Sequence, residues 1–352
     1  MGDQSLVRLR KSWCAGLAAI FAAILIEPAA AAGVEDFYRG KTLAIVIGSS
    51  VGGGYDQYAR VLARYLGRHI PGQPTMVPQN MPAAGGLRAA KYLYAAAPKD
   101  GTVIGTFSRS IAVTPLLSSD SSFDGTQYTW LGSVDSNNNP LCITSSKSSI
   151  KTWHDMLTNT VVLAGQGTGA DANIFAHLYE NVFGAKIKLV PGYPGTNDIM
   201  LAMDRGEVDG FCGGMSWTTL EITRPDWIRD KSINVIIQAQ AGVKSVPALA
   251  SVPIAMEMTD DPEKKQILNL ILGPHQVMAR PFAAPPGVPE DRKAALIKAF
   301  NDTVKDPEFL ATAEKVRMEV SPTTAGEIDA LLRELYATPK HIVAQAAKAI
   351  TE

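Results

Sequence analysis

Two glycine-rich loops carry the chemistry that this sequence indicates most clearly. A Gly-Gly-Gly run at residues 52–54 follows an apolar stretch and precedes Asp56, and the loop at residues 165–169 stands in the same way ahead of Asp171. The first backbone N–H groups of a helix have no partner within it, and the helix dipole is positive there. Because glycine has no side chain, a carboxylate can approach such amides closely. The two loops therefore predict anion binding through the backbone, with Asp56 and Asp171 as helix caps.

Polar side chains near other predicted strand ends could complete an anion site. Arg109 offers a planar fork that can hold a carboxylate with two bonds, and it could equally be an arginine with a structural partner. The hydroxyls of Thr168 and Thr196 could donate to a ligand or cap a helix. The predicted ligand-binding residues are Ser49, Ser50, Gly53, Gly54, Tyr55, Ala84, Gly85, Ser108, Arg109, Thr168, Gly169, Tyr193 and Thr196.

The sequence pattern lacks side-chain sets typical of catalysis, metal binding or nucleotide binding. The five histidines show no metal-ligand spacing, and no Gly-x-Ser-x-Gly motif occurs. Neither glycine loop continues as Gly-Lys-Ser/Thr. A formal net charge of -1 gives no reason to expect nucleic-acid binding. We therefore predict a protein that is not an enzyme and that needs neither a metal nor a cofactor.

Alternating strands and helices position these loops. An apolar, β-branched run at residues 42–47 leads into the first loop, and a helical repeat follows from Asp56 to about Gly67. Strand 161–164 and helix 171–183 flank the second loop in the same order. Further predicted strands span residues 102–107, 141–144, 186–190, 208–212 and 233–238, further helices span 198–205, 290–304, 307–316 and 325–350, and a turn spans 281–289. This alternation predicts an α/β fold with mostly parallel sheets.

The N-terminus has the layout of a secretory signal peptide. Basic residues up to Lys11 precede an apolar run at residues 13–26, and small residues lead to a predicted cleavage site after Ala32. The remaining chain of about 320 residues is longer than one core usually organises, so two domains are expected. Cys142 and Cys212 remain in it and could form one disulfide or stay as buried thiols.

Several ordered motifs then resemble one family. The stretches FYRGKTLAIVIGSSVGGGYDQYARVLARYLGRHI and VPQNMPAAGGLRAAKYLYAAAPKDGTVIG come first, followed by Tyr193-Pro194-Gly195, the step at residues 206–209 and the Ala-Pro-Pro-Gly-Val-Pro run at 284–289. Together they resemble the periplasmic receptors of tripartite tricarboxylate transporters, also called Bug-type receptors. The resemblance covers most of the chain beyond the signal peptide.

This resemblance implies a two-lobed, type II-like periplasmic binding protein with the ligand cleft between the lobes. Domain 1 would comprise residues 33–135 and 243–352, and domain 2 residues 136–242. The implied function is capture of a small organic carboxylate, by a monomer in the periplasm, for the membrane permease subunits of a secondary transporter. The alternatives are a receptor that feeds a sensor kinase and an exported enzyme on the same fold.

The departures from the family pattern fall in the predicted site. Gly48, Ser49 and Val51 stand where many members have prolines and an aromatic residue, and Pro194 stands where a lysine is frequent. Gly48 and Ser49 motivate the hypothesis of a smaller or more hydroxylated pocket floor.

Overall fold

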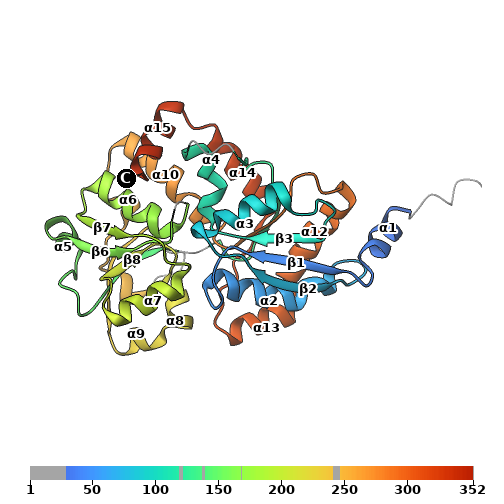
Figure 1. The fold of residues 1–352 in the computed structure, drawn as a ribbon, viewed down its shortest axis with the longest axis horizontal. Helices are drawn as coiled ribbons and strands as arrows, with labels where there is room; N and C mark the ends of the chain where they lie inside the picture. The colour runs from blue at the N-terminus through green and yellow to red at the C-terminus, as the bar shows by residue number, and fades with distance from the viewer. Residues whose placement is uncertain (1–28, 119–121, 137–138, 168, 241–245, 352) are drawn as a thin grey trace, which may run out of the picture.

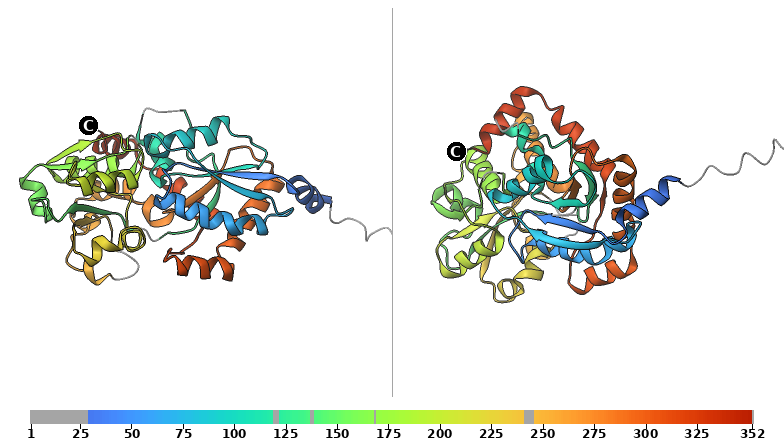
Figure 2. Two further views of the ribbon diagram at one scale, coloured as in Figure 1. Left: turned by 60° about the horizontal axis from the view of Figure 1, so that its bottom comes forward. Right: turned by 45° about the vertical axis from the view of Figure 1, so that its right-hand side comes forward.

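The computed structural model describes residues 29–118, 122–136, 139–167, 169–240 and 246–351. The first 28 residues of the predicted signal peptide, and the predicted site residue Thr168, lie outside these ranges. Two α/β lobes lie side by side (Figure 1), and the views in Figure 2 show the same division from other directions. The first lobe contains the strands on either side of the second lobe in the sequence, so the chain crosses between the lobes twice.

A six-stranded sheet forms the centre of the first lobe. Its strands are β1 (Thr42–Ile47), β2 (Thr75–Asn80), β3 (Val103–Thr106), β4 (Thr129–Ser133), β10 (Pro281–Ala284) and β11 (Thr323–Thr324). Their order across the sheet is β11-β4-β10-β3-β1-β2. The β1 strand pairs in parallel with β2 and β3, whereas β10 is antiparallel to both β3 and β4.

A five-stranded sheet forms the centre of the second lobe. Its strands are β5 (Leu141–Ser145), β6 (Val161–Ala164), β7 (Ile187–Val190), β8 (Gly210–Cys212) and β9 (Ile233–Gln238), in the order β7-β6-β8-β5-β9. The β6 strand is parallel to β7 and β8, and β5 is antiparallel to β8 and β9. The returning chain enters the first sheet as β10, between β4 and β3, and β3 is the strand that ends just before Ser108.

Both sheets are mixed, which corrects the prediction of mostly parallel sheets. The antiparallel pairs arise where the chain crosses between lobes, at β4 and β5 on the way out and at β9 and β10 on the way back. The sequence pattern indicated neither β2 nor β4, and it assigned β10 to a turn. These segments carry turn-forming residues: Pro78 in β2, Gly132 with φ +145° in β4, and Pro281 at the start of β10. Tertiary pairing overrides those local signals.

Helices cover both faces of each sheet. The first lobe carries α1 (Ala29–Tyr38), α2 (Gly54–His69), α3 (Leu87–Lys91), α4 (Thr114–Leu117), α12 (Glu290–Thr303), α13 (Pro307–Lys315) and α14 (Ala325–Tyr336). The second carries α5 (Trp153–Thr158), α6 (Asp171–Phe183), α7 (Thr196–Arg205), α8 (Trp217–Thr223) and α9 (Pro225–Arg229). Short 3₁₀ or π turns occupy Ala84–Gly86, Tyr92–Ala96, Arg109–Val113, Pro247–Leu249 and Ala255–Glu257.

Three helices join the lobes near their shared edge. These are α10 (Pro262–Leu272), α11 (Pro274–Val277) and α15 (Lys340–Ala349). The predicted helix at residues 325–350 is two helices, because Pro339 ends the helical run before α15. In Figure 1, α15 and α10 lie above the second lobe near α6. The Asn181 side chain donates to the carbonyl oxygens of Ala349 and Thr351 at 3.2 and 2.9 Å. The C-terminal helix therefore contacts the second lobe, although the predicted boundaries assign it to domain 1.

Candidate functional site

A cavity lies between the two lobes, where the two glycine-rich loops meet. The loop after β1, the turn at Gly85 and Ser108 behind β3 form its wall on the first lobe. Gln166, Gly195 and Gly214 belong to its wall on the second lobe. The volume is about 40 Å³, which is room for a carboxylate group or a few water molecules at about 10–15 Å³ each. The lobes are therefore close together around this site.

The position of the cavity follows from the parallel strands. The β1, β3 and β6 strands all end at this edge of their sheets, and the carboxyl ends of parallel strands are where open α/β sheets bind ligands. The first intrahelical bond of α2 runs from Gln57 N–H to the Gly53 carbonyl at 3.0 Å. Gly54 and Tyr55 precede it, so the helix leaves their N–H groups without intrahelical partners. Backbone donors thus stand at the cavity, and their binding of an anion stays a prediction.

Two glycines are required by the close approach of the lobes. At Gly85, where φ is +64°, a Cβ atom would lie 2.3 Å from the Cβ of Ala170 in the second lobe. At Gly195 it would lie 1.9 Å from the Ser50 hydroxyl oxygen of the first lobe. Real Cβ atoms do not approach other atoms this closely. Because Gly85 and Gly195 have no Cβ atom, their backbone can lie against side chains of the other lobe at the cavity.

Asp56 holds the first glycine loop, but it is not the helix cap that the sequence predicted. Gly53 occupies the cap position, and Asp56 lies in the first turn of α2. Its carboxylate accepts a bond from the Gly52 N–H at 2.8 Å and pairs with Arg60 at 2.9 Å. The Asn80 amide donates to it as well, at 2.8 Å. The Asp56 side chain thus fixes the loop, and the N–H groups of Gly54 and Tyr55 stay available to a ligand.

Asp171 is likewise not a cap, because Ala170 takes that position on α6. Its buried carboxylate instead crosses from the second lobe to the first, where Ser108 and Ser110 donate to Oδ1 at 2.8 and 2.6 Å. Arg109 donates to Oδ2 at 2.9 Å. Burial raises the pKa of Asp171, but the Arg109 guanidinium, His275 and the serine hydroxyls outweigh it and hold the pKa well below its usual range. Asp171 is therefore an anion that binds the lobes together.

Arg109 has a structural partner, which is one of the two alternatives left open by the sequence. The side chain is fully buried, and besides Asp171 it donates to the Ala279 carbonyl at 3.0 Å. His275 lies against the same cluster, with Nε2 3.3 Å from the Ser110 hydroxyl. Burial, and secondarily the positive charge of Arg109, lowers the pKa of His275 to about 3. The imidazole is therefore neutral at physiological pH.

Sequence reasoning did not place Arg280 in the site, and it also left out the cavity residues Gln166, Pro194, Gly195 and Gly214. Arg280 stands immediately before β10 and lines the cavity, with 1% of its surface exposed. Its guanidinium carbon lies 4.8 Å from the ring centre of Tyr55 and 5.1 Å from that of Tyr58. The sequence pattern predicted a turn at residues 281–289, directly after Arg280. A buried arginine at the start of a strand has no local sequence signal, so it was not identified.

The cavity brings together about half of the predicted ligand-binding residues. Seven of them line it: Ser49, Gly53, Gly54, Tyr55, Gly85, Ser108 and Thr196. Ser50 and Ala84 lie just behind this wall, at the contacts with Gly195 and with Gly167. Gly169 lies near Thr114, Tyr193 packs in the core of the second lobe, and Arg109 is buried with Asp171. Gly48 lines the cavity beside Ser49, as the pocket-floor hypothesis requires, and that hypothesis stays a prediction.

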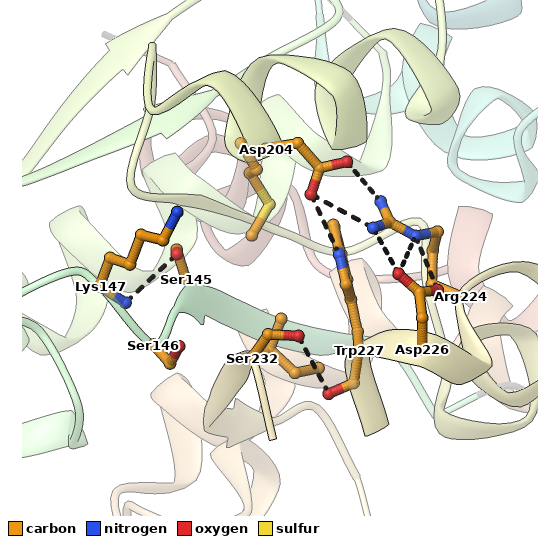
Figure 3. A pocket seen from close by; sticks show the side chains of 10 residues that line it. Ser145, Ser146, Lys147, Asp204, Arg224, Asp226, Trp227 and Ser232 are labelled. Carbon is orange, nitrogen blue, oxygen red and sulfur yellow. Dashed lines mark hydrogen bonds and ion pairs between the residues drawn. The ribbon is translucent and has the colours of Figure 1, made fainter. Parts of the chain in front are cut away.

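Other hollows of the described chain lack these features. One, about 1110 Å³, lies between α8 on one side and α13 with the residues after it on the other, away from both glycine loops. Another, about 180 Å³, lies in the second lobe (Figure 3). There Arg224 pairs with Asp204 at 2.9 Å and Asp226 at 2.8 Å, and its guanidinium stacks on Trp227. The charges of Arg224, Asp204 and Asp226 are therefore satisfied within the chain.

Cys142 and Cys212 form a disulfide, which settles the choice that the sequence left open. They are direct partners in the antiparallel pair of β5 and β8, and both are fully buried. Among the described residues, no group of three or more His, Cys, Asp or Glu side chains could hold a metal ion. Within the same part of the chain, no helix combines the length and apolar character needed to cross a membrane.

Comparison with solved structures matches nearly the whole chain. The periplasmic binding protein BugD has a TM-score of 0.69 and 20% identity over 88% of this chain and 98% of its own. A Rhodopseudomonas palustris protein solved with adipate has a TM-score of 0.65 and 17% identity over 87% and 97%. The chain has the fold of a Bug-type periplasmic binding protein. MatC from the same organism, solved with bound malate, has a TM-score of 0.64 and 16% identity over 86% and 99%.

Sequence comparison gives a shorter match, and no family model matches the chain. A protein of Agrobacterium vitis described as a UPF0065 protein in the TAR-I ttuE-ttuC' intergenic region is 27% identical over 196 residues. The match covers 53% of this chain and spans about half, 55%, of that relative. The comparisons confirm the predicted resemblance to Bug-type receptors and the two-lobed α/β fold.

Proposed function

We propose that this protein is a periplasmic solute-binding receptor that captures a small organic carboxylate between its two lobes. In this proposal it then presents the ligand to the permease subunits of a tripartite tricarboxylate-type transporter and does no chemistry on it. The observation that carries the proposal is the cavity between the lobes, with helix-start amides at Gly54 and Tyr55 beside it. Amides at the positive end of a helix favour anions.

The arrangement of the cavity supports a clamp mechanism. Its walls come from both lobes, so a ligand placed there would contact both and favour their approach. The ion pair of Arg109 and Asp171 and the glycine contacts at Gly85 and Gly195 already join the lobes beside it. Hinge opening would have to break these contacts. The bound malate and adipate of two proteins with this fold support carboxylates as the ligand class.

Thermal unfolding against a panel of acids tests the proposal. The purified protein is heated with mono-, di- and tricarboxylates, and separately with neutral amides of the same carbon skeletons. A ligand present at about 100 times its Kd stabilises the folded state by about 2.7 kcal/mol, which raises the melting temperature by several degrees. We expect at least one acid to do so and to be recovered unchanged. Stabilisation by neutral compounds alone, or conversion of the acid, would contradict the proposal.

A further inference from the structure

Arg280 is a buried cation without a carboxylate partner. Its Nη1 donates to the Ala279 carbonyl at 3.2 Å and its Nη2 to the Thr219 hydroxyl at a long 3.4 Å. The Nε atom is buried and makes no hydrogen bond, and no ion pair joins Arg280 to an acidic side chain of the described chain. A buried charge is costly unless it is paired. Arg280 therefore brings to the cavity a positive charge that no acidic side chain of the described residues pairs with.

The other buried arginine of this region shows what a complete environment looks like. Arg109 shares the Ala279 carbonyl with Arg280, because that oxygen accepts a bond from each guanidinium. It holds the Asp171 carboxylate at 2.9 Å, and that carboxylate is further saturated by two serine hydroxyls. Asp171 is thus committed to Arg109. The buried Asp135 contacts Arg280 through the backbone, where its carbonyl oxygen accepts the Arg280 N–H at 3.2 Å.

The Arg280 guanidinium lies at the wall of the cavity, and its Nε atom is buried there. Gly54 lies over it: a Cβ there would be 3.0 Å from Nη2 and 3.6 Å from the central carbon. The aromatic rings of Tyr55 and Tyr58 cover the guanidinium and hold it in place. Nε and Nη2 form the edge that a carboxylate grips with two parallel hydrogen bonds. Gly54 and Tyr55, which begin α2, line the same cavity.

From this geometry we infer that Arg280 binds a carboxylate group of the ligand, and that recognition by this protein combines an arginine fork with the α2 amides. The inference rests on the proposed function and makes it more specific. It requires the bound end of the ligand to be an ionised acid, since a neutral amide would leave the buried guanidinium without a counter-charge. The Ser49 and Thr196 side chains, on the two walls, are then left for the remainder of the ligand.

Binding measurements with matched acids and amides test this inference. Acetate, succinate, malate and adipate are titrated into the wild-type protein, together with the corresponding neutral amides. The acid that stabilises the wild type is then titrated into Arg280→Gln, Arg280→Lys and Arg224→Gln. We expect at least a tenfold increase in Kd for Arg280→Gln, because hydrogen bonds to charged groups are worth about 1.5–3 kcal/mol and 1.4 kcal/mol is a factor of ten. Arg224 lies in the separate hollow of Figure 3, so its variant should bind as the wild type does.

The outcomes separate the inference from the proposed function. An acid that binds the wild type and Arg280→Gln with equal Kd overturns the role of Arg280 and leaves the receptor function standing. Failure of every acid to bind the wild type overturns both. An equal response to an acid and its amide overturns the requirement for a charge. A smaller loss in Arg280→Lys than in Arg280→Gln, with the acid preference kept, supports it.

The ligand-free protein gives a second test that does not depend on the panel. If Arg280 waits for a ligand anion, replacing it by Met removes an uncompensated buried charge, and the melting temperature should stay level or rise. The matched variant Arg109→Met removes a paired charge, and its melting temperature should fall. Unfolding of Arg280→Met without ligand would overturn the inference, because it would make Arg280 a structural residue.

Discussion

Two buried arginines that donate to one carbonyl group show how this protein separates structure from recognition. Arg109 and Arg280 are both less than 2% exposed, and both donate to the Ala279 oxygen. Arg109 has its carboxylate partner within the chain, at Asp171, whereas Arg280 has only a carbonyl and a distant hydroxyl. The first arginine joins the lobes, and the second faces the space between them. A buried charge that the fold does not neutralise is where a ligand charge is expected.

Breaking the Arg109 pair should have the largest effect on stability. Arg109→Met leaves the buried Asp171 anion with the serine hydroxyls and with His275 at 3.9 Å, but without its guanidinium partner. Removal of one partner of a buried pair costs about 3–5 kcal/mol. The measurement is the free energy of unfolding by urea at neutral pH. The same substitution at Arg280 should cost much less, or nothing, in the absence of ligand.

A double variant sharpens that comparison. Arg109→Met combined with Asp171→Leu removes both charges, so it should recover a large part of the loss caused by Arg109→Met alone. Equal losses in the single and double variants would mean that packing, and not the unpaired anion, is responsible.

His275 should make the stability of this region depend on pH. Burial lowers its folded pKa to about 3, whereas an unfolded histidine has a pKa of about 6.5, so the unfolded chain binds the additional proton between these values. The stabilisation is complete above pH of about 6.5 and is lost as the pH falls, by up to about 1.4 kcal/mol per pH unit. Asp171, whose pKa is also lowered, adds its own loss only below its unfolded pKa of about 3.9.

Urea unfolding at pH 6.5 and 4.5 checks this prediction. The wild type should lose about 2 kcal/mol more over this range than His275→Gln, which has no proton to gain. His154→Gln is the control, because His154 is exposed on α5. If His275→Gln and the wild type lose the same free energy, His275 is not the group that titrates. Water would then have more access to His275 than its burial indicates.

The sequence predicts the parts of this site that depend on local pattern. The glycine loops, the strands before them and the helices after them have signals within about ten residues, so residues such as Gly53, Gly85 and Ser108 could be identified. The charged cluster has no such signal, because its members meet only in the folded chain. Ser108 and Asp171 are 63 residues apart, and Arg109 and Ala279 are 170 apart. Arg280 was missed for that reason, since β10 forms only by pairing with β3 and β4.

Arg224, which has two acidic partners, gives the smallest expected effect and tests whether burial or pairing makes the difference. Arg224 pairs with two carboxylates and stacks on Trp227 (Figure 3), whereas Arg109 pairs with one carboxylate. However, 18% of the Arg224 side chain and 44% of each aspartate side chain are exposed. Water can solvate the partners when the arginine is removed. Arg224→Met should therefore cost no more than about 2 kcal/mol, even with its additional contacts. A loss as large as that of Arg109→Met would mean that the number of partners, and not their exclusion from water, sets the cost.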